Sequence, residues 1–194
     1  DSIKLLLEYS NYPKFTTPYN LLGVLRERFI YFVIARQGNG LTALYGLSFR
    51  LMNLPNTLIA SSLRPLMFQQ LKKHGFKKFQ KNILFAQETL TSMFPALWAF
   101  LLVYAEQIFN FIFDDKWNGA GIIASIISIS TVPHMLSNYL DRVFDITGKQ
   151  QYAFIIELVT SLCILVGIFT CIKLGHNGIY IIITHSLILS SFYI

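Results

Sequence analysis

Six apolar runs of about the length that crosses a bilayer constrain the fold of this chain more than any other feature. The hydrocarbon core of a membrane is about 30 Å thick, and an α-helix needs about 20 residues to cross it. Glycine-rich or charged turns separate the runs, and no soluble domain fits between them. The sequence therefore predicts an all-α, polytopic bundle of about six transmembrane helices, which forms a single lobe over residues 1–194. The expected spans are 18–36, 41–71, 83–104, 119–144, 152–172 and 179–194.

The composition agrees with a membrane protein and excludes a disordered chain. Hydrophobic residues make up 54% of the 194 residues and charged residues 13%, whereas a soluble domain is about 25% charged. Cys163 and Cys171 lie in one apolar run, where a disulfide within a straight helix is not reasonable, and no metal-binding spacing is present. We therefore expect no metal and no cofactor. Because the chain starts at Asp1 and ends inside an apolar run, we also expect it to be a fragment of a longer protein.

Lysine and arginine are unevenly distributed between alternate loops. Three loops hold only Arg36, Lys116 and Lys173. About ten basic residues lie in or beside the segment before the first span and the loops that follow the second and fourth spans, namely Lys4, Lys14, Arg64, Lys72, Lys73, Lys77, Lys78, Lys81, Arg142 and Lys149. The positive-inside rule places these three segments in the cytoplasm. The basic loop 72–81 is interpreted as a topology determinant on the inner leaflet.

Three consecutive charged residues, Arg26, Glu27 and Arg28, interrupt the first span. At ~1.5 Å per residue they lie about 12–15 Å into the membrane, near its middle. Their insertion costs about 8 kcal/mol, and the nine Leu, Ile, Val and Phe residues of the span contribute only about 4–5 kcal/mol in the other direction. The three charges must therefore face a protein interior or a water-filled cavity.

Arg50 lies at a similar depth in the second span, where Glu27 is its natural partner. The local excess of charge is positive unless Glu88 of the third span or Glu157 of the fifth contributes, and the same counting places both about 7–10 Å from the cytoplasmic side. Such an excess suits a phosphate or pyrophosphate, because a guanidinium binds oxyanions bidentately. The alternative is that carboxylates and carbonyls of a tight bundle satisfy these arginines. Since Arg26 and Arg28 lie about 200° apart on a helix, both cannot point equally into one cavity.

Prolines and histidines within the spans carry weaker signals. Pro55 and Pro133 permit kinks and are hinge candidates. His134 and His185 are expected to be hydrogen-bonded core residues rather than proton carriers.

In residues 12–22, 40–55, 59–69 and 113–121, in this order, the chain resembles four motifs of the Wzx-type O-antigen flippases of polysaccharide and lipopolysaccharide biosynthesis. Residues 12–22 (YPKFTTPYNLL) resemble F-P-x-Y-S-T-P-x-x-L-L-N, which opens the seventh helix of that family. Residues 40–55 resemble G-x-Y-x-L-A-x-R-V-L-x-L-P, which aligns Tyr45, Arg50 and Pro55 with it. Residues 59–69 resemble I-G-x-S-I-x-Q-V-F-x-Q, and residues 113–121 resemble F-G-x-x-W-x-x-A-G.

The chain departs from this pattern at two places. The family has polar uncharged residues where this chain has Arg26, Glu27 and Arg28, and it has glycine in place of Asp114.

The resemblance implies a place in the MOP superfamily, which also contains MATE and MurJ-like exporters and whose members have two six-helix lobes. The chain would be the C-terminal lobe of a multi-pass protein of the bacterial inner membrane. Its partners would be membrane lipid, the missing N-terminal lobe and a polysaccharide polymerase or ligase complex. It would flip a lipid-linked oligosaccharide, such as an undecaprenyl-pyrophosphate O-unit, by alternating access. Arg26, Arg28 and Arg50 would attract the anionic headgroup.

Three other classes of function are weighed against a flippase. A MATE-like exporter of small cations is disfavoured by the positive excess in the spans. An enzyme would need a nucleophile, base or metal, and the acidic pair Asp114 and Asp115 has no histidine near it in sequence, so we expect no enzyme. A non-catalytic membrane module of a polysaccharide export complex stays open. Nucleic acid is not an expected partner.

Overall fold

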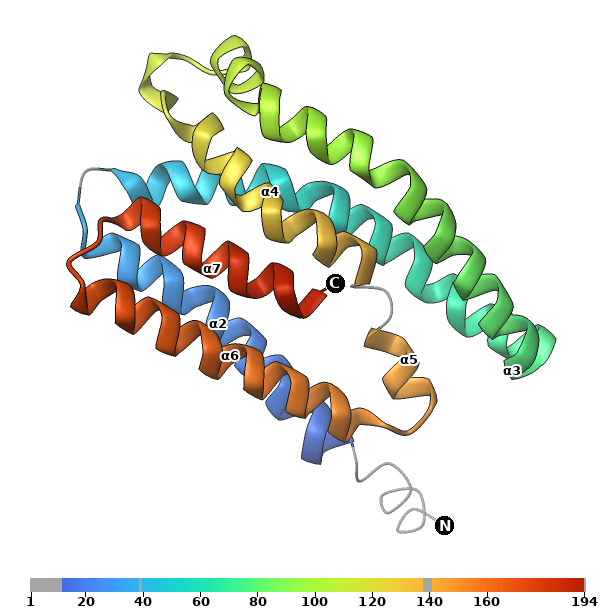
Figure 1. Ribbon diagram of the computed structural model, residues 1–194. Helices are drawn as coiled ribbons and strands as arrows, with labels where there is room; N and C mark the ends of the chain where they lie inside the picture. Colours follow the sequence, from blue (N-terminus) through green and yellow to red (C-terminus); the bar gives the residue numbers. More distant parts are fainter. Residues whose placement is uncertain (1–11, 39, 138–140, 194) are drawn as a thin grey trace. The chain divides into compact units, whose positions relative to one another are not determined.

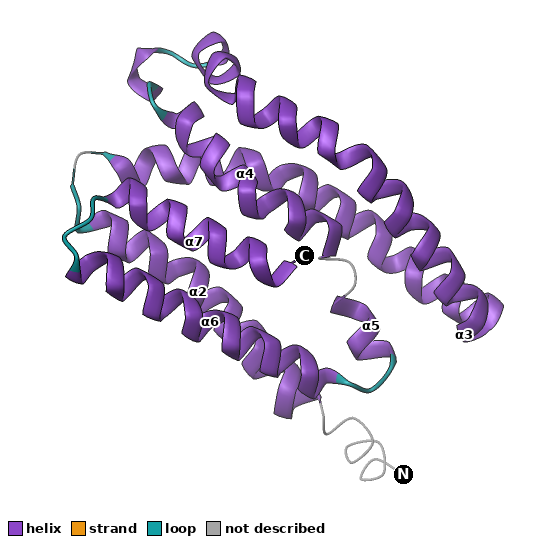
Figure 2. Ribbon diagram, viewed as in Figure 1, coloured by secondary structure: helices purple, strands orange, loops and turns teal. Residues whose placement is uncertain are grey.

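The computed structural model describes residues 12–38, 40–137 and 141–193, and these residues are helical throughout apart from short turns (Figure 2). No strand is present in these ranges, so the all-α prediction is confirmed. Two helices are long and apolar enough to cross a membrane, and a bent pair of helical segments, Lys77–Ala96 and Trp98–Ile112, would bring the number to three. A bundle of six spans therefore stays a prediction.

The elements follow the expected spans closely at both ends of the chain. The elements are η1 (Tyr12–Thr16), α2 (Thr17–Ala35), α3 (Leu41–Ile112), η2 (Asp115–Trp117), α4 (Ala120–Ser137), α5 (Asp141–Ile146), α6 (Gln150–Lys173) and α7 (Gly178–Tyr193). Helices α2, α6 and α7 begin and end within two residues of the predicted spans 18–36, 152–172 and 179–194. The fourth predicted span, 119–144, covers α4 and the first residues of α5, with residues 138–140 between them outside the described residues. Its length stays a prediction.

α3 joins the two predicted spans 41–71 and 83–104 in one 72-residue element. The basic loop expected at 72–81 is wrong, because this segment is helical except at Gly75, where φ is 73° and ψ 171°. Lysine and glutamine are good helix formers, so a charged segment without proline continues the helix. Gly75 supplies the positive φ that other residues avoid, and the two arms of α3 fold back on each other (Figure 1). The non-helical dihedral angles of α3 lie at Gly75, and Pro55 lies inside the first helical arm, where its role as a hinge stays a prediction.

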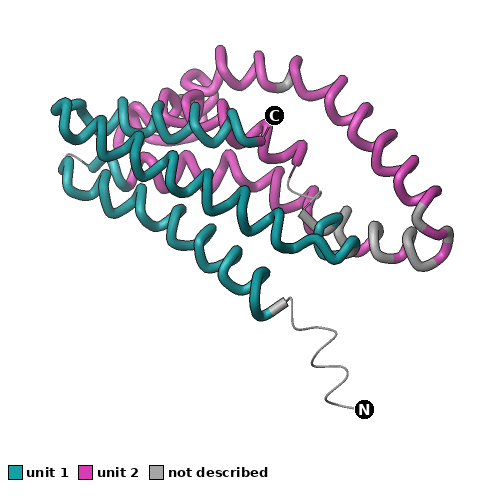
Figure 3. Tube along the Cα trace, turned by 60° about the horizontal axis from the view of Figure 1, so that its bottom comes forward, with its two compact units in different colours: residues 1–42, 140–192 teal, residues 43–139, 193–194 magenta. Residues whose placement is uncertain are grey.

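The described chain divides into two compact units (Figure 3). Unit 1 contains residues 1–42 and 140–192, and unit 2 contains residues 43–139 with 193–194. The single lobe expected over residues 1–194 stays a prediction.

Unit 1 is built from α2, α6 and α7. α2 and α6 lie side by side (Figure 1). Isoleucines dominate the interior of this unit, and all of the following are almost fully buried: Ile30, Ile34, Ile164, Ile168, Ile181 and Ile182. β-branched side chains of this kind have few rotamers to lose, so their burial in a close-packed interior fixes the faces that the helices present to one another.

Unit 2 packs α4 against both arms of α3. Ala120 and Ala124 of α4 contact Ala105 and Phe109 near one end, and Val132 and Met135 contact Phe94 near the other. Gly121 allows the backbones to approach closely, because a Cβ there would collide with the backbone of Glu106. The Ser48 hydroxyl also donates to the Ala120 carbonyl at 2.6 Å. Small residues at a close helix contact are typical of membrane bundles.

Candidate functional site

α6 buries several polar residues beside its isoleucines and exposes many of its large apolar side chains, which is unusual for a helix in a soluble protein. Glu157 is 8% exposed, and Thr160 and Ser161 are also buried, whereas Val166 is 67% and Phe169 61% exposed. In hydrocarbon, apolar side chains face lipid at no cost, while charged ones must face the protein interior. The interior of unit 1 is therefore the place where polar chemistry can occur.

The centre of this interior is an ion pair between α2 and α6. Arg26 Nε lies 3.3 Å from Glu157 Oε1, and the two side chains are 9% and 10% exposed. The Ser161 hydroxyl lies 3.5 Å from the same carboxylate oxygen, to which it donates. A buried charge is strongly unfavourable alone, so each partner makes the burial of the other tolerable.

Two further residues of unit 1 border this ion pair. His185 of α7 is 5% exposed and lies within electrostatic reach of Arg26. Gly23, one turn before Arg26 on α2, approaches the Glu157 carboxylate, since a Cβ at this position would lie 3.7 Å from Oε1. The polar interior of unit 1 therefore contains the Arg26–Glu157 pair of α2 and α6, and α7 adds the buried His185.

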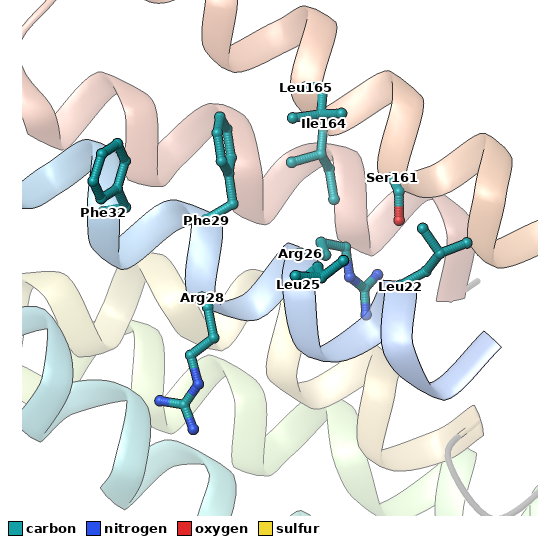
Figure 4. Close-up of a pocket in the computed structure, with 9 residues that line it drawn as sticks. All are labelled: Leu22, Leu25, Arg26, Arg28, Phe29, Phe32, Ser161, Ile164 and Leu165. Atoms are coloured by element: carbon teal, nitrogen blue, oxygen red, sulfur yellow. The ribbon is translucent and has the colours of Figure 1, made fainter. Parts of the chain in front are cut away.

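Arg28 and Glu27 do not join this polar interior. Figure 4 shows Arg26 directed toward Ser161, whereas the Arg28 side chain leaves α2 in another direction. Glu27 and Arg28 are both exposed. This difference agrees with their angular separation from Arg26 around the helix axis.

A cavity of about 380 Å³ lies between α2 and α6. Its lining is mostly apolar and consists of Leu22, Leu25, Arg26, Arg28, Phe29, Phe32, Ser161, Ile164 and Leu165 (Figure 4). The volume lies in the range of about 300–1,000 Å³ that is usual for small-molecule pockets.

The remaining predicted site residues, which are two charged residues and two prolines, lie within helices of unit 2. Arg50 and Glu88 belong to unit 2 and are exposed. The ion pair that the structure shows within the described residues is that of Arg26 with Glu157. Glu27 belongs to unit 1 and Arg50 to unit 2, so their expected pairing stays a prediction. Pro133 is buried within α4, and Pro55 is exposed on α3.

A second polar contact lies in unit 2, and it confirms that His134 is hydrogen-bonded, although the sequence did not identify Asn56 as its partner. The buried Asn56 places Nδ2 2.9 Å from Asn53 Oδ1 and 3.0 Å from His134 Nδ1. If Nδ2 donates both hydrogens, His134 Nδ1 accepts and the neutral ring carries its proton on Nε2. Asn53 and Asn56 are three residues apart and so share one helix face. This spacing was the available signal, but it does not say which helix lies opposite.

Within residues 12–38, 40–137 and 141–193, no group of three or more His, Cys, Asp or Glu side chains is placed to hold a metal ion. Cys163 is exposed and Cys171 is buried, and both are free thiols. Asp114 and Asp115 are exposed in the short segment between α3 and α4.

No protein-family model matches the chain, and no similar curated protein or solved structure was found. The order and spacing of the four sequence motifs are therefore the support for a family relationship.

Proposed function

We propose that this chain is one lobe of a transporter that moves a lipid-linked oligosaccharide across the bacterial inner membrane. The substrate would be an undecaprenyl-pyrophosphate-linked unit or a similar lipid, carried from the cytoplasmic to the periplasmic leaflet. Alternating access would come from rocking of this lobe against a second one around a shared site. The support from sequence is the set of four motifs that resemble the flippase family, in the same order along the chain.

The observation that carries the proposal is the placement of Arg28. This arginine lies near the middle of the apolar helix α2 and is exposed, and no described carboxylate forms an ion pair with it. A lone cation at that depth is costly in a membrane. A phosphate-bearing substrate would remove this cost through bidentate, charge-assisted hydrogen bonds.

The three arginines of the hypothesised headgroup site take different roles in this proposal. Arg26 is paired with Glu157 and holds α2 to α6. Arg28 and Arg50 are exposed and can each reach a ligand. The same positive charges would repel a small cationic substrate, which disfavours a MATE-like exporter.

A glycan-export assay in cells tests the proposal. The complete protein is expressed in a bacterial strain that lacks its own oligosaccharide-lipid flippase, and surface glycan is scored together with membrane abundance. Loss of one charge-assisted phosphate contact costs about 1.5–3 kcal/mol, so Arg28→Ala and Arg50→Ala should each lower surface glycan at least about tenfold. Their abundance in the membrane should be unchanged.

Arg36→Ala is the matched control, because Arg36 is an exposed arginine at the end of α2, outside the expected span. It should export glycan normally. If the complete protein never restores surface glycan, or if Arg28→Ala and Arg50→Ala export as well as Arg36→Ala, the proposal is wrong. A loss of glycan that only follows a loss of abundance would assign these arginines to folding and also contradict it.

A further inference from the structure

The arms of α3 are longer than a membrane is thick. At ~1.5 Å per residue, the arm before Gly75 and the arm after it each extend about 50 Å, against about 30 Å of hydrocarbon. α4, with 18 residues, has about the length of the hydrocarbon core. α4 packs against residues between Leu44 and Ile59 on the first arm of α3 and between Leu90 and Phe109 on the second arm. We call residues 60–89 the hairpin tip, and Figure 1 shows this end of α3 extending past α4.

One face of the second arm is exposed along the hairpin tip and carries two kinds of side chain. Lys77, Lys78 and Lys81 are exposed, and one turn further along Leu84 is 56% and Phe85 69% exposed. At ~100° per residue these five positions fall within about 120° of arc. Glu88 follows on the same face, which keeps a net positive charge. The opposite face is buried through Phe79 and Phe94.

The second arm is also not straight. The segment Lys77–Ala96 is bent by 45° from Trp98–Ile112. If Trp98–Ile112 crosses the membrane, Lys77–Ala96 is inclined to that crossing.

We propose that the hairpin tip docks on the anionic cytoplasmic leaflet of the membrane. Lys77, Lys78 and Lys81 bind lipid phosphates, and Leu84 and Phe85 insert where the headgroups meet the acyl chains. Exposed Leu and Phe beside lysines are typical of helices that lie in this interface. The uneven distribution of basic residues places this end of α3 on the cytoplasmic side, where the leaflet is negatively charged. This inference does not depend on what the chain transports.

Spin-label depth measurements in vesicles test the docking. The complete protein, with Cys163→Ser and Cys171→Ser, receives one nitroxide at position 85 or at position 77. The vesicles contain phosphatidylcholine alone or phosphatidylcholine with phosphatidylglycerol. With phosphatidylglycerol, the label at position 85 should become accessible to oxygen, which partitions into the bilayer, and shielded from a water-soluble nickel complex. The label at position 77 should remain shallower than that at 85. A label at Val166, on the exposed apolar face of α6, gives the reference for full immersion.

Lysine variants separate the charge from the fold. Each lysine near an anionic membrane surface contributes about 1 kcal/mol of binding free energy, so its removal should lower the preference for phosphatidylglycerol about fivefold. Lys77→Gln/Lys81→Gln should therefore abolish most of the phosphatidylglycerol effect at position 85, and Lys77→Arg/Lys81→Arg should keep it. Lys116→Gln/Lys173→Gln removes the same charge elsewhere and should have no effect. If the label at position 85 is equally open to nickel in both lipids, or if the glutamine variant behaves like the unsubstituted protein, the tip does not dock on the leaflet.

Discussion

Arg26 shows how a single residue can decide whether an apolar helix is tolerated in a membrane. α2 carries two arginines and a glutamate near its middle, and by sequence its insertion is unfavourable. The structure places Arg26 against Glu157 of α6, with both side chains about nine-tenths buried. A membrane crossing by α2 would therefore require α6 to be in place beside it.

Exchanging the charges of Arg26 and Glu157 gives a prediction at the scale of single residues. Arg26→Glu and Glu157→Arg should each lower the free energy of unfolding by about 3–5 kcal/mol, because each leaves two like charges buried together. The double variant Arg26→Glu/Glu157→Arg should recover most of that loss. Unfolding of the purified protein in mixed micelles of mild detergent and dodecyl sulfate measures the three values.

Glu27→Ala is the control for that series, since Glu27 is the exposed neighbour of Arg26. Its effect should stay within about 0.5 kcal/mol. A double variant no more stable than the sum of its two single variants would mean that Arg26 and Glu157 do not interact in the folded protein.

The sequence limited the candidate carboxylate partners in the spans to a few glutamates, but it could not identify which of them pairs with Arg26. Depth counting places Glu88 and Glu157 at similar distances from the cytoplasmic side, so both were charge-partner candidates. Which of them meets Arg26 depends on how α2 and α6 are rotated about their axes when they pack. The contact of Asn56 with His134 was missed for the same reason, since the neighbour of α3 is set by packing and not by local pattern.

At the scale of single elements, apolar length predicted the bounds of α2, α6 and α7 to within two residues. Polarity failed as a signal at residues 72–81, which are helical on both sides of Gly75. Polarity indicates contact with water or headgroups, whereas helix formation depends on residue type and the absence of a breaker. The one residue of that segment that ends a helix is a glycine with positive φ.

The close contact between α4 and α3 gives a prediction at this scale. Gly121→Ala should destabilise unit 2 by about 1–3 kcal/mol, because its new Cβ meets the fixed backbone of Ala105 and Glu106. Gly167→Ala is the matched control, since its Cβ would meet only the flexible end of Ile188 and the Thr184 methyl. It should be close to neutral, with helix propensity in its favour. Equal losses in the two variants, measured in the same micelle assay, would mean that the α4–α3 contact does not restrict residue 121.

At the scale of the whole molecule, composition predicted helices of membrane-spanning character, and two helices meet the length and apolarity that a span requires. The other expected spans fail that test for identifiable reasons. α2 contains three charged residues, α7 is only 16 residues long, and α3 is a bent hairpin. The charged residues of α2 would need a place in the protein interior for this helix to cross a bilayer. The six crossings therefore stay a prediction.

The number and direction of the crossings is the central claim, and cysteine labelling tests it most directly. In a Cys163→Ser/Cys171→Ser background, single cysteines replace five exposed residues, namely Gln37, Lys73, Asn118, Lys149 and His176. Six crossings predict that a membrane-impermeant thiol reagent labels positions 37, 118 and 176 on spheroplasts. Positions 73 and 149 should be labelled only after the membrane is opened. Labelling of position 73 or 149 from the outside, or protection of position 37, 118 or 176, would contradict the account.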